Sequence, residues 1–271
     1  LKGYADLQPW PELGDPTLQE ILNAKSSSLF EAARANAITD LHARQKKQDL
    51  LLGAESVRSH YLCPDLKTHG LPASLENLTQ AQKEGYQTAK IKCGRDINFE
   101  LQVLEMIPTV FAGQLRLDFN ASLDFLQAQS MINSLSPKLK NQIEFIEDPC
   151  IFKMNNWRDL NKLTPLACDF CIPEEEVNLP FQYRIVKPSR MKRTEFEALL
   201  QDTRTSVVVT TQMGHGVDTL QAFASVLSCS QLRRQTHGLQ TFDLYEKDVI
   251  SQHLKKEGSA VKGFQRDIGL G

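Results

Sequence analysis

The segment Thr88-Ala89-Lys90-Ile91-Lys92-Cys93 decides the fold class, because its charged and apolar side chains alternate with the period of two that a β-strand imposes. Lys90 and Lys92 fall on one face of this predicted strand, and the small or apolar side chains fall on the other. Lysine pairs on an exposed edge strand are common. The alternative is that both lysines point into the interior of a closed sheet, and neighbouring segments decide between the two.

A second segment, Leu115-Arg116-Leu117-Asp118-Phe119-Asn120, alternates in the same way. It sends Arg116, Asp118 and Asn120 to one face and its three apolar side chains to the other. Two successive strands with this pattern favour a polar interior that the strands share, with their apolar faces covered by helices.

Short, β-branched segments alternate with amphipathic stretches of about ten to fifteen residues from residue 58 onward, which is typical of repeated βα units. Eight segments have the character of strands: Arg58–Cys63, Thr88–Cys93, Leu115–Phe119, Ile143–Glu147, Leu166–Asp169, Tyr183–Lys187, Ser206–Thr211 and Leu239–Leu244. Together they predict an α/β fold, a (β/α)8-like barrel of the modified TIM type.

Five successive predicted strands finish in charged side chains, each one βα unit after the last: Lys92, Asp118, Glu147, Asp169 and Lys187. In a barrel, these carboxyl ends surround the active site. Three carboxylates there would repel one another strongly unless a cation lies between them. Oxygen ligands without a nearby histidine select a hard ion, so we expect Mg²⁺, for which Mn²⁺ can substitute. We expect the cation and partial burial to lower the lysine pKa values towards neutrality, as acid–base chemistry requires.

The first 55 residues have a different character. A proline-rich opening precedes a long predicted helix from Thr17 to Leu52, which is rich in Ala, Leu and Gln. Because one strand and helices cannot close a core of their own, we interpret residues 1–55 as the remnant of a small preceding domain. Residues 56–271 are then the barrel domain.

Composition excludes several classes of protein. The 271 residues include 31 Lys and Arg against 33 Asp and Glu, a formal net charge of -2, which argues against a nucleic-acid partner bound through a general basic field. No apolar run approaches the roughly 18 residues of a membrane span, and the opening residues do not form a signal peptide. The six scattered cysteines indicate reduced thiols, so we expect a cytoplasmic protein. The oligomeric state is left open.

The strand-end residues resemble those of the enolase superfamily, in the branch with Lys-x-Lys on the second strand and one lysine on the sixth. The resemblance implies that Lys90 and Lys92 are a catalytic pair and that Lys187 is the lysine on the opposite face of the substrate. It also implies that residues 1–55 belong to an α+β capping domain whose earlier strands precede this sequence. The implied metal ligands are Asp118, Glu147 and Asp169.

Within the superfamily, the likeness is greatest to a dehydratase of menaquinone biosynthesis. Arg116 two residues before Asp118, the segment Thr210–Gly214 and the segment Gly238–Leu244 carry it. It implies a Mg²⁺-dependent lyase that dehydrates a succinyl-hydroxycyclohexadiene carboxylate through a metal-stabilised enediolate. The implied substrate contacts are Lys90, Arg116, Asn120, Thr210, Thr211 and Gly238. Asp169 is followed by Phe170, where the family usually has an acid. The supporting role that this acid has next to the metal ligand is therefore unassigned in this chain.

Two other functions fit the same residues. A racemase of N-acylamino acids or an epimerase of dipeptides would use the two-lysine geometry to exchange an α-proton, and a non-catalytic barrel would keep the metal site as a scaffold. Cys168 and Cys171 have the spacing of a zinc half-site, but the lack of a second pair favours core cysteines. His215 is interpreted as a loop histidine.

Overall fold

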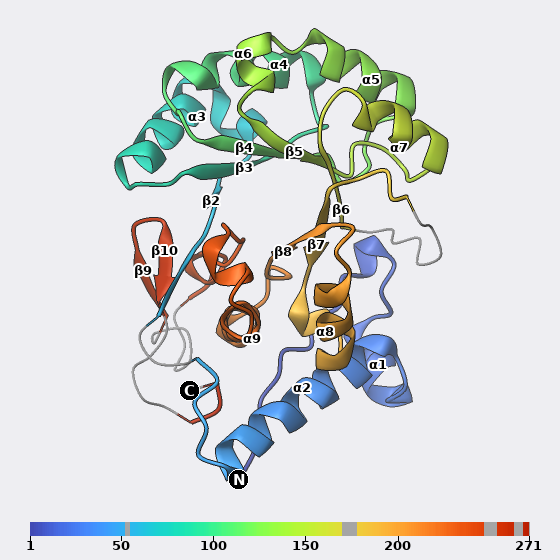
Figure 1. The fold of residues 1–271 in the computed structure, drawn as a ribbon, viewed down its shortest axis with the longest axis vertical. Helices are drawn as coiled ribbons and strands as arrows, with labels where there is room; N and C mark the ends of the chain where they lie inside the picture. The colour runs from blue at the N-terminus through green and yellow to red at the C-terminus, as the bar shows by residue number, and fades with distance from the viewer. Residues whose placement is uncertain (52–54, 170–177, 247–253, 263–267, 271) are drawn as a thin grey trace. The chain divides into compact units, whose positions relative to one another are not determined.

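The computed structural model describes residues 1–51, 55–169, 178–246, 254–262 and 268–270. The chain divides into two compact units (Figure 1). The central unit consists of residues 60–185 and 203–207. The terminal unit consists of residues 1–59, 186–202 and 208–271.

The main sheet has seven strands in the order β2-β3-β4-β5-β6-β7-β8. They are β2 (Tyr61–Leu62), β3 (Thr88–Lys92), β4 (Gln114–Asp118), β5 (Ile143–Glu147), β6 (Leu166–Cys168), β7 (Tyr183–Val186) and β8 (Ser206–Val209). Neighbouring strands from β2 to β7 pair in parallel. Strands that follow the order of the sequence, with helices between them, confirm the predicted α/β architecture of repeated βα units.

Helices cover one side of β3, β4 and β5 in the central unit (Figure 1). They are α3 (Leu66–Lys83), α4 (Ile97–Met106), α5 (Phe125–Ser134), α6 (Pro137–Lys140) and α7 (Met154–Asn161). Most begin after a side chain that accepts a hydrogen bond from the first turn, as Asp96 does from the Phe99 amide. The outer strand residues Ile91, Leu117 and Ile146 are fully buried in the resulting core, so the opposite strand face carries the charged groups.

The terminal unit combines helices with a small antiparallel sheet of order β1-β10-β9. Its strands are β1 (Ser56–Arg58), β9 (Lys255–Glu257) and β10 (Ala260–Lys262). Its α-helices are α1 (Leu18–Ala24), α2 (Ser28–Gln45), α8 (Arg193–Gln201) and α9 (Gly216–Leu227). Single 3-10 turns are η1 (Pro11–Leu13), η3 (Pro188–Arg190), η4 (Leu232–Arg234) and η5 (Phe242–Leu244), and η2 (Ile107–Thr109) lies in the central unit.

The predicted helix from Thr17 to Leu52 is wrong as one element. Lys25 adopts a left-handed conformation, with φ 51°, and ends α1. The Ser27 side chain accepts a hydrogen bond from the Phe30 amide and begins α2, which ends at Gln45. Local capping at residues 25–27 therefore overrides the helix-favouring composition on both sides. Leu52 lies outside the described residues.

The predicted eighth strand, Leu239–Leu244, is also wrong. The described backbone has only isolated parallel bridges just before it, one of them between Thr210 and Gly238, and then turns into η5. Side chains replace the missing ladder: His237 Nδ1 accepts a hydrogen bond from the Val209 amide at 3.0 Å. The predicted strand Arg58–Cys63 is divided between β1 and β2, which pair with different strands.

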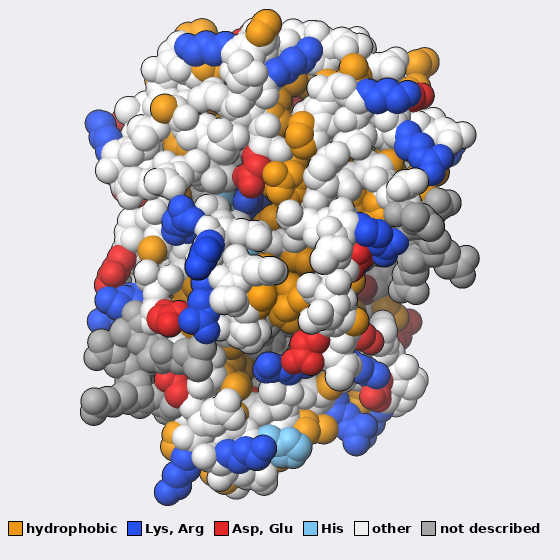
Figure 2. Space-filling model, in the orientation of Figure 1, with side chains coloured by type: hydrophobic (Ala, Val, Ile, Leu, Met, Phe, Trp, Pro, Cys, Tyr) orange, Lys and Arg blue, Asp and Glu red, His pale blue; other side chains and the backbone are white. Residues whose placement is uncertain are grey.

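Two observations concern membrane and nucleic-acid partners, which the composition argues against. No helix among the described residues is long and apolar enough to cross a membrane. On the face drawn in Figure 2, lysine and arginine side chains are spread over many elements instead of gathering in one basic patch.

Candidate active site

The register of three parallel strands aligns charged side chains at the carboxyl end of the central unit's sheet. Lys92 on β3 is the register partner of Asp118 on β4, which in turn is the partner of Glu147 on β5. The second pairing depends on an irregularity between Leu115 and Arg116, where the register of β4 against β5 shifts by one residue. Without this shift Asp118 would align with an apolar residue of β5, so the irregularity builds the site.

Lys90 and Lys92 share the same carboxylate. Lys90 Nζ lies 2.8 Å from Asp118 Oδ2 and 2.8 and 2.7 Å from the two Glu147 oxygens. Lys92 Nζ lies 2.5 Å from Asp118 Oδ2 and 3.2 Å from Asn120 Oδ1. The Lys92 side chain is 41% exposed and that of Lys90 only 10%, so Lys92 is the lysine that a molecule from solvent can reach.

Burial and charge oppose each other in this group. Burial would lower the pKa of Lys90, but Asp118 and Glu147 outweigh it and raise that pKa. Burial likewise works to raise the pKa of Asp118, but Lys90 and Lys92 lower it well below its usual value. Burial and the neighbouring Asp118 raise the pKa of Glu147 to about 7. Among its protein neighbours Lys90 is thus a charged ion-pair partner, and the expectation that a bound cation lowers the lysine pKa values stays a prediction.

A second carboxylate group lies next to the first. Oxygen atoms of Glu147, Asp148 and Asp169 all lie within 4.8 Å of one another. Both Asp148 oxygens are 3.3 Å from the Asp169 amide nitrogen, which donates to them. Burial, Asp169 and Glu147 raise the pKa of Asp148 to about 8. We call Glu147, Asp148 and Asp169 the acidic cluster.

The acidic cluster fits a divalent metal ion. Its donors are all carboxylate oxygens, which hard cations prefer. Burial first, and the neighbouring carboxylates second, raise the pKa values of Glu147 and Asp148, so a bound cation would favour their ionised forms. Of the predicted ligands, Glu147 and Asp169 belong to the cluster, whereas Asp118 lies against the two lysines.

Asp148 escaped the sequence-based prediction although it directly follows Glu147. Strict alternation along β5 would send it to the opposite face. In the structure its φ of 41° is left-handed, and this turn directs it toward Asp169. An acid immediately after a strand-end acid and before Pro149 is the signal that could have identified it.

Binding of Mg²⁺ is expected to strengthen between about pH 6 and pH 8.5, because the ion must displace protons from carboxylates with raised pKa values. Both folded pKa values, about 7 and about 8, exceed those of unfolded chains, so stability present below about pH 4 is lost as the pH rises through 7 and 8. The bound ion would offset this loss. Differential scanning fluorimetry should therefore show a larger rise in Tm with Mg²⁺ at the higher pH.

The Asp148→Asn variant is the control for this pH dependence. It replaces one titrating carboxylate with an uncharged amide of nearly the same shape. The difference in the Mg²⁺-dependent rise in Tm between the two pH values should therefore shrink. A rise in Tm at about pH 8.5 no greater than that at about pH 6 would contradict the charge argument.

The remaining predicted residues of the central unit differ in their surroundings. The Arg116 side chain is buried, with Nε 2.8 Å from Glu144 and Nη1 3.1 Å from His60 Nδ1, and it covers the ring of Phe145. Asn120 lies at the Lys92 ammonium. Both residues stay predictions as substrate contacts.

The terminal unit carries the other predicted residues. The Thr211 amide donates to the Gly238 carbonyl at 3.0 Å, and Thr210 is bridged to Gly238. These three residues are therefore neighbours. Lys187 directly follows β7 and precedes η3. Cys168 is buried, whereas Cys171 lies outside the described residues. The His215 ring packs against Tyr245, with centroids 5.0 Å apart.

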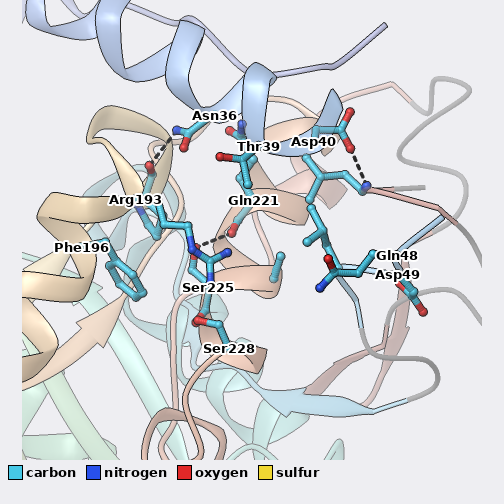
Figure 3. A pocket seen from close by; sticks show the side chains of 14 residues that line it. Asn36, Thr39, Asp40, Gln48, Asp49, Arg193, Phe196, Gln221, Ser225 and Ser228 are labelled. Carbon is cyan, nitrogen blue, oxygen red and sulfur yellow. Dashed lines mark hydrogen bonds between the residues drawn. The ribbon is translucent and has the colours of Figure 1, made fainter. Parts of the chain in front are cut away.

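A separate cavity of about 250 Å³ lies within the terminal unit, between α2, α8 and α9 (Figure 3). Two hydrogen bonds join groups of its lining: Asn36 Nδ2 donates to the Pro188 carbonyl at 3.1 Å, and the Leu270 amide donates to Asp40 at 2.7 Å. None of the predicted site residues is among those described as lining it.

Comparison with known families gives two matches along the chain. Residues 73–180 match the family described as enolase C-terminal domain-like. Residues 1–43 match the family described as o-succinylbenzoate synthase, N-terminal domain.

Two curated relatives carry the same name. An o-succinylbenzoate synthase from Bdellovibrio bacteriovorus is 29% identical over 272 residues, which cover 95% of this chain and 80% of that protein. One from Pectobacterium atrosepticum is 26% identical over 277 residues, which cover 92% of this chain and 81% of that protein.

Solved structures with similar folds belong to several enzymes. A dipeptide epimerase from Enterococcus faecalis matches with a TM-score of 0.76 at 15% identity, over 99% of this chain and 90% of that one. The L-Ala-D/L-Glu epimerase from Bacillus subtilis matches with a TM-score of 0.72 at 18% identity, over 96% and 79%. At these identities the matches concern the fold alone, and they confirm the predicted fold class.

Proposed function

Because the chain belongs to the enolase superfamily, we propose that it is an o-succinylbenzoate synthase, a Mg²⁺-dependent lyase of menaquinone biosynthesis. Its substrate would be 2-succinyl-6-hydroxycyclohexadiene carboxylate. The observation that carries this proposal is the accessible Lys92 ammonium beside Asp118, with Lys90 and the acidic cluster behind it. The two relatives of that name and the match of residues 1–43 favour the synthase over other members.

The proposed metal ligands are Asp118, Glu147 and Asp169. Asp148 would orient Asp169 by accepting a hydrogen bond from the Asp169 backbone amide. When bound, Mg²⁺ would stabilise the negative charge that develops on the substrate carboxylate as the α-proton leaves. Lys90, held between Asp118 and Glu147, would keep these carboxylates ionised and help to hold the substrate carboxylate.

Lys92 is the proposed base. Its amine would remove the α-proton, and the resulting ammonium would protonate the departing hydroxide on the same face. Asp118 and Asn120 hold Lys92 Nζ at its position before the substrate arrives. Lys187 is assigned a positive charge that stabilises the flat intermediate without proton transfer.

The domain organisation follows the same resemblance. We propose that residues 1–55 belong to a capping domain and residues 56–271 to the barrel domain, and the match of residues 1–43 to an N-terminal domain family supports this. We also propose a reducing, cytoplasmic location, which the scattered spacing of the six cysteines supports.

Incubation in D₂O with Mg²⁺ tests the proposed function. The cyclohexadiene carboxylate should yield an aromatic product, followed by absorbance, while N-acylamino acids and dipeptides should gain no α-deuterium by mass spectrometry. Deuteration without aromatic product would instead establish the epimerase alternative. If the protein binds the metal but catalyses neither reaction, both enzyme hypotheses are wrong and the non-catalytic scaffold remains.

A further inference from the structure

The loop Thr210–Gly214, which follows β8, is held through its backbone by one buried carboxylate. The amides of Gln212 and Gly214 both donate to Asp218 Oδ2, at 2.9 and 3.0 Å. Met213 between them has a left-handed φ of 63°. Asp218 lies in the first turn of α9 and is fully buried, so these hydrogen bonds anchor the loop to the protein interior.

The second oxygen of Asp218 reaches the turn that follows β7. Ser189 Oγ donates to Asp218 Oδ1 at 2.7 Å. Ser189 belongs to η3, which begins directly after Lys187, and the Arg190 amide closes the turn on the Lys187 carbonyl at 2.9 Å. Pro188 restricts the backbone between them. One carboxylate thus ties the turn after β7 to the loop after β8.

The N-terminal segment binds the same two turns. Gln212 Nε2 donates to Asp6 Oδ2 at 2.8 Å, and Trp10 Nε1 donates to the Gln212 carbonyl at 3.1 Å. Arg190 pairs with Asp15 at 2.8 Å. A Cβ atom on Gly214 would clash with Asp6 Oδ2 and come within 2.7 Å of Asp218 Cβ, so only glycine fits there.

We propose that Asp218 is a positioning residue, which sets Lys187 and the pair Thr210 and Thr211 relative to one another. This inference rests on the proposed function, which gives Lys187 the charge that stabilises the intermediate and the threonines a substrate contact. The hydrogen bonds from Ser189, Gln212 and Gly214 to the carboxylate come from the two turns that carry these residues. These hydrogen bonds thus fix the positions of the two turns relative to each other.

Burial and hydrogen bonding have opposite effects on the Asp218 carboxyl group. Burial raises the pKa of its carboxyl group to about 6, against the hydrogen bonds from Ser189, Gly214 and Gln212. The three hydrogen bonds thus offset part of the free-energy cost of burying the charged form.

Alanine and asparagine at position 218 separate geometry from charge. An asparagine can accept both loop amides on its oxygen and donate its amide to Ser189 Oγ, whereas alanine makes none of these bonds. We expect Asp218→Ala to lower kcat/KM for the cyclohexadiene carboxylate by about 100-fold, and Asp218→Asn to recover most of that loss.

The contacts of Ser189 and of Gln212 should affect different kinetic constants. Ser189→Ala frees the turn after Lys187 and should mainly lower kcat, because the charge acts in the transition state. Gln212→Ala frees the loop from Asp6 and should mainly raise KM. Ser225→Ala, which also removes a side-chain hydroxyl bond in α9, is the matched control and should change neither.

Hydrogen exchange gives a readout that does not depend on activity. In Asp218→Ala, but not in Asp218→Asn or Ser225→Ala, the amides of residues 187, 189–191 and 210–214 should exchange at least about 10-fold faster than in the parent protein. The rise in Tm with Mg²⁺ should stay unchanged, since the proposed ligands belong to the central unit. Exchange of these amides unaltered in Asp218→Ala would overturn the positioning role.

The failure of this inference differs from the failure of the proposed function. A parent protein that forms no aromatic product would refute the synthase, whatever the variants do. An active parent whose Asp218→Ala variant keeps kcat/KM within about threefold would refute only the role of Asp218.

Discussion

Lys92→Ala is expected to lower kcat for dehydration by at least about 10⁴-fold, because a single side chain is assigned both proton transfers and each such group typically contributes about 10²- to 10⁴-fold. Alanine removes the only ammonium that shares Asp118 with Lys90 in the described site while it leaves the acidic cluster untouched. Steady-state absorbance of the aromatic product and α-proton exchange in D₂O measure the two transfers separately.

Metal binding distinguishes lost chemistry from a damaged site. Lys92 competes as a cation for Asp118, so its removal should leave the affinity for Mg²⁺ equal or higher. Lys83→Ala, at the exposed end of α3, is the matched control and should keep full activity. Turnover of Lys92→Ala within about tenfold of the parent would assign the base elsewhere and favour Lys187 and the racemase alternative.

Glu147→Gln is expected to weaken Mg²⁺ binding by about 100-fold or more, a loss beyond the effect of changing a group that only orients a ligand. Glu147 is the residue common to both carboxylate groups: it pairs with Lys90, and it belongs to the acidic cluster. Its amide analogue keeps the shape but loses the charge that attracts the ion. Isothermal titration calorimetry with Mg²⁺ measures the affinity, and the absence of a metal-dependent rise in Tm should accompany the loss.

Comparison of Asp118→Asn with Asp148→Asn shows which acid completes the metal site. The proposed ligand set predicts a loss similar to that of Glu147→Gln for Asp118→Asn, and about 10-fold for Asp148→Asn, which would act through Asp169. The opposite order would move the ligand role to Asp148. Glu76→Gln, on the outer helix α3, is the control for a lost surface charge.

Much of the central unit could be predicted because its signals are local. The strand Ile143–Glu147 agrees with the prediction residue for residue, and β3 and β4 differ by one residue at their ends. Alternation of side chains is a property of an extended backbone, and it requires no knowledge of distant residues. The same property is enough to place Lys90 and Lys92 on one face of their strand.

Other features could not be predicted, because they depend on partners far away in the sequence. Leu239–Leu244 has strand-like composition, yet His237 takes the Val209 amide and the chain then turns. The antiparallel sheet of β1, β9 and β10 joins segments about 200 residues apart, and no local pattern predicts such a pairing.

The parallel α/β arrangement and the charged residues at the strand ends follow from side-chain period and strand length, which are properties of the sequence. The way in which these charges meet depends on the folded chain. The register shift of β4 aligns Asp118 with Glu147, the left-handed backbone of Asp148 brings in an unpredicted acid, and Asp218 joins two turns. Each of these features depends on backbone geometry or on a contact between distant residues. The alternation of side chains along one strand gives no information about either.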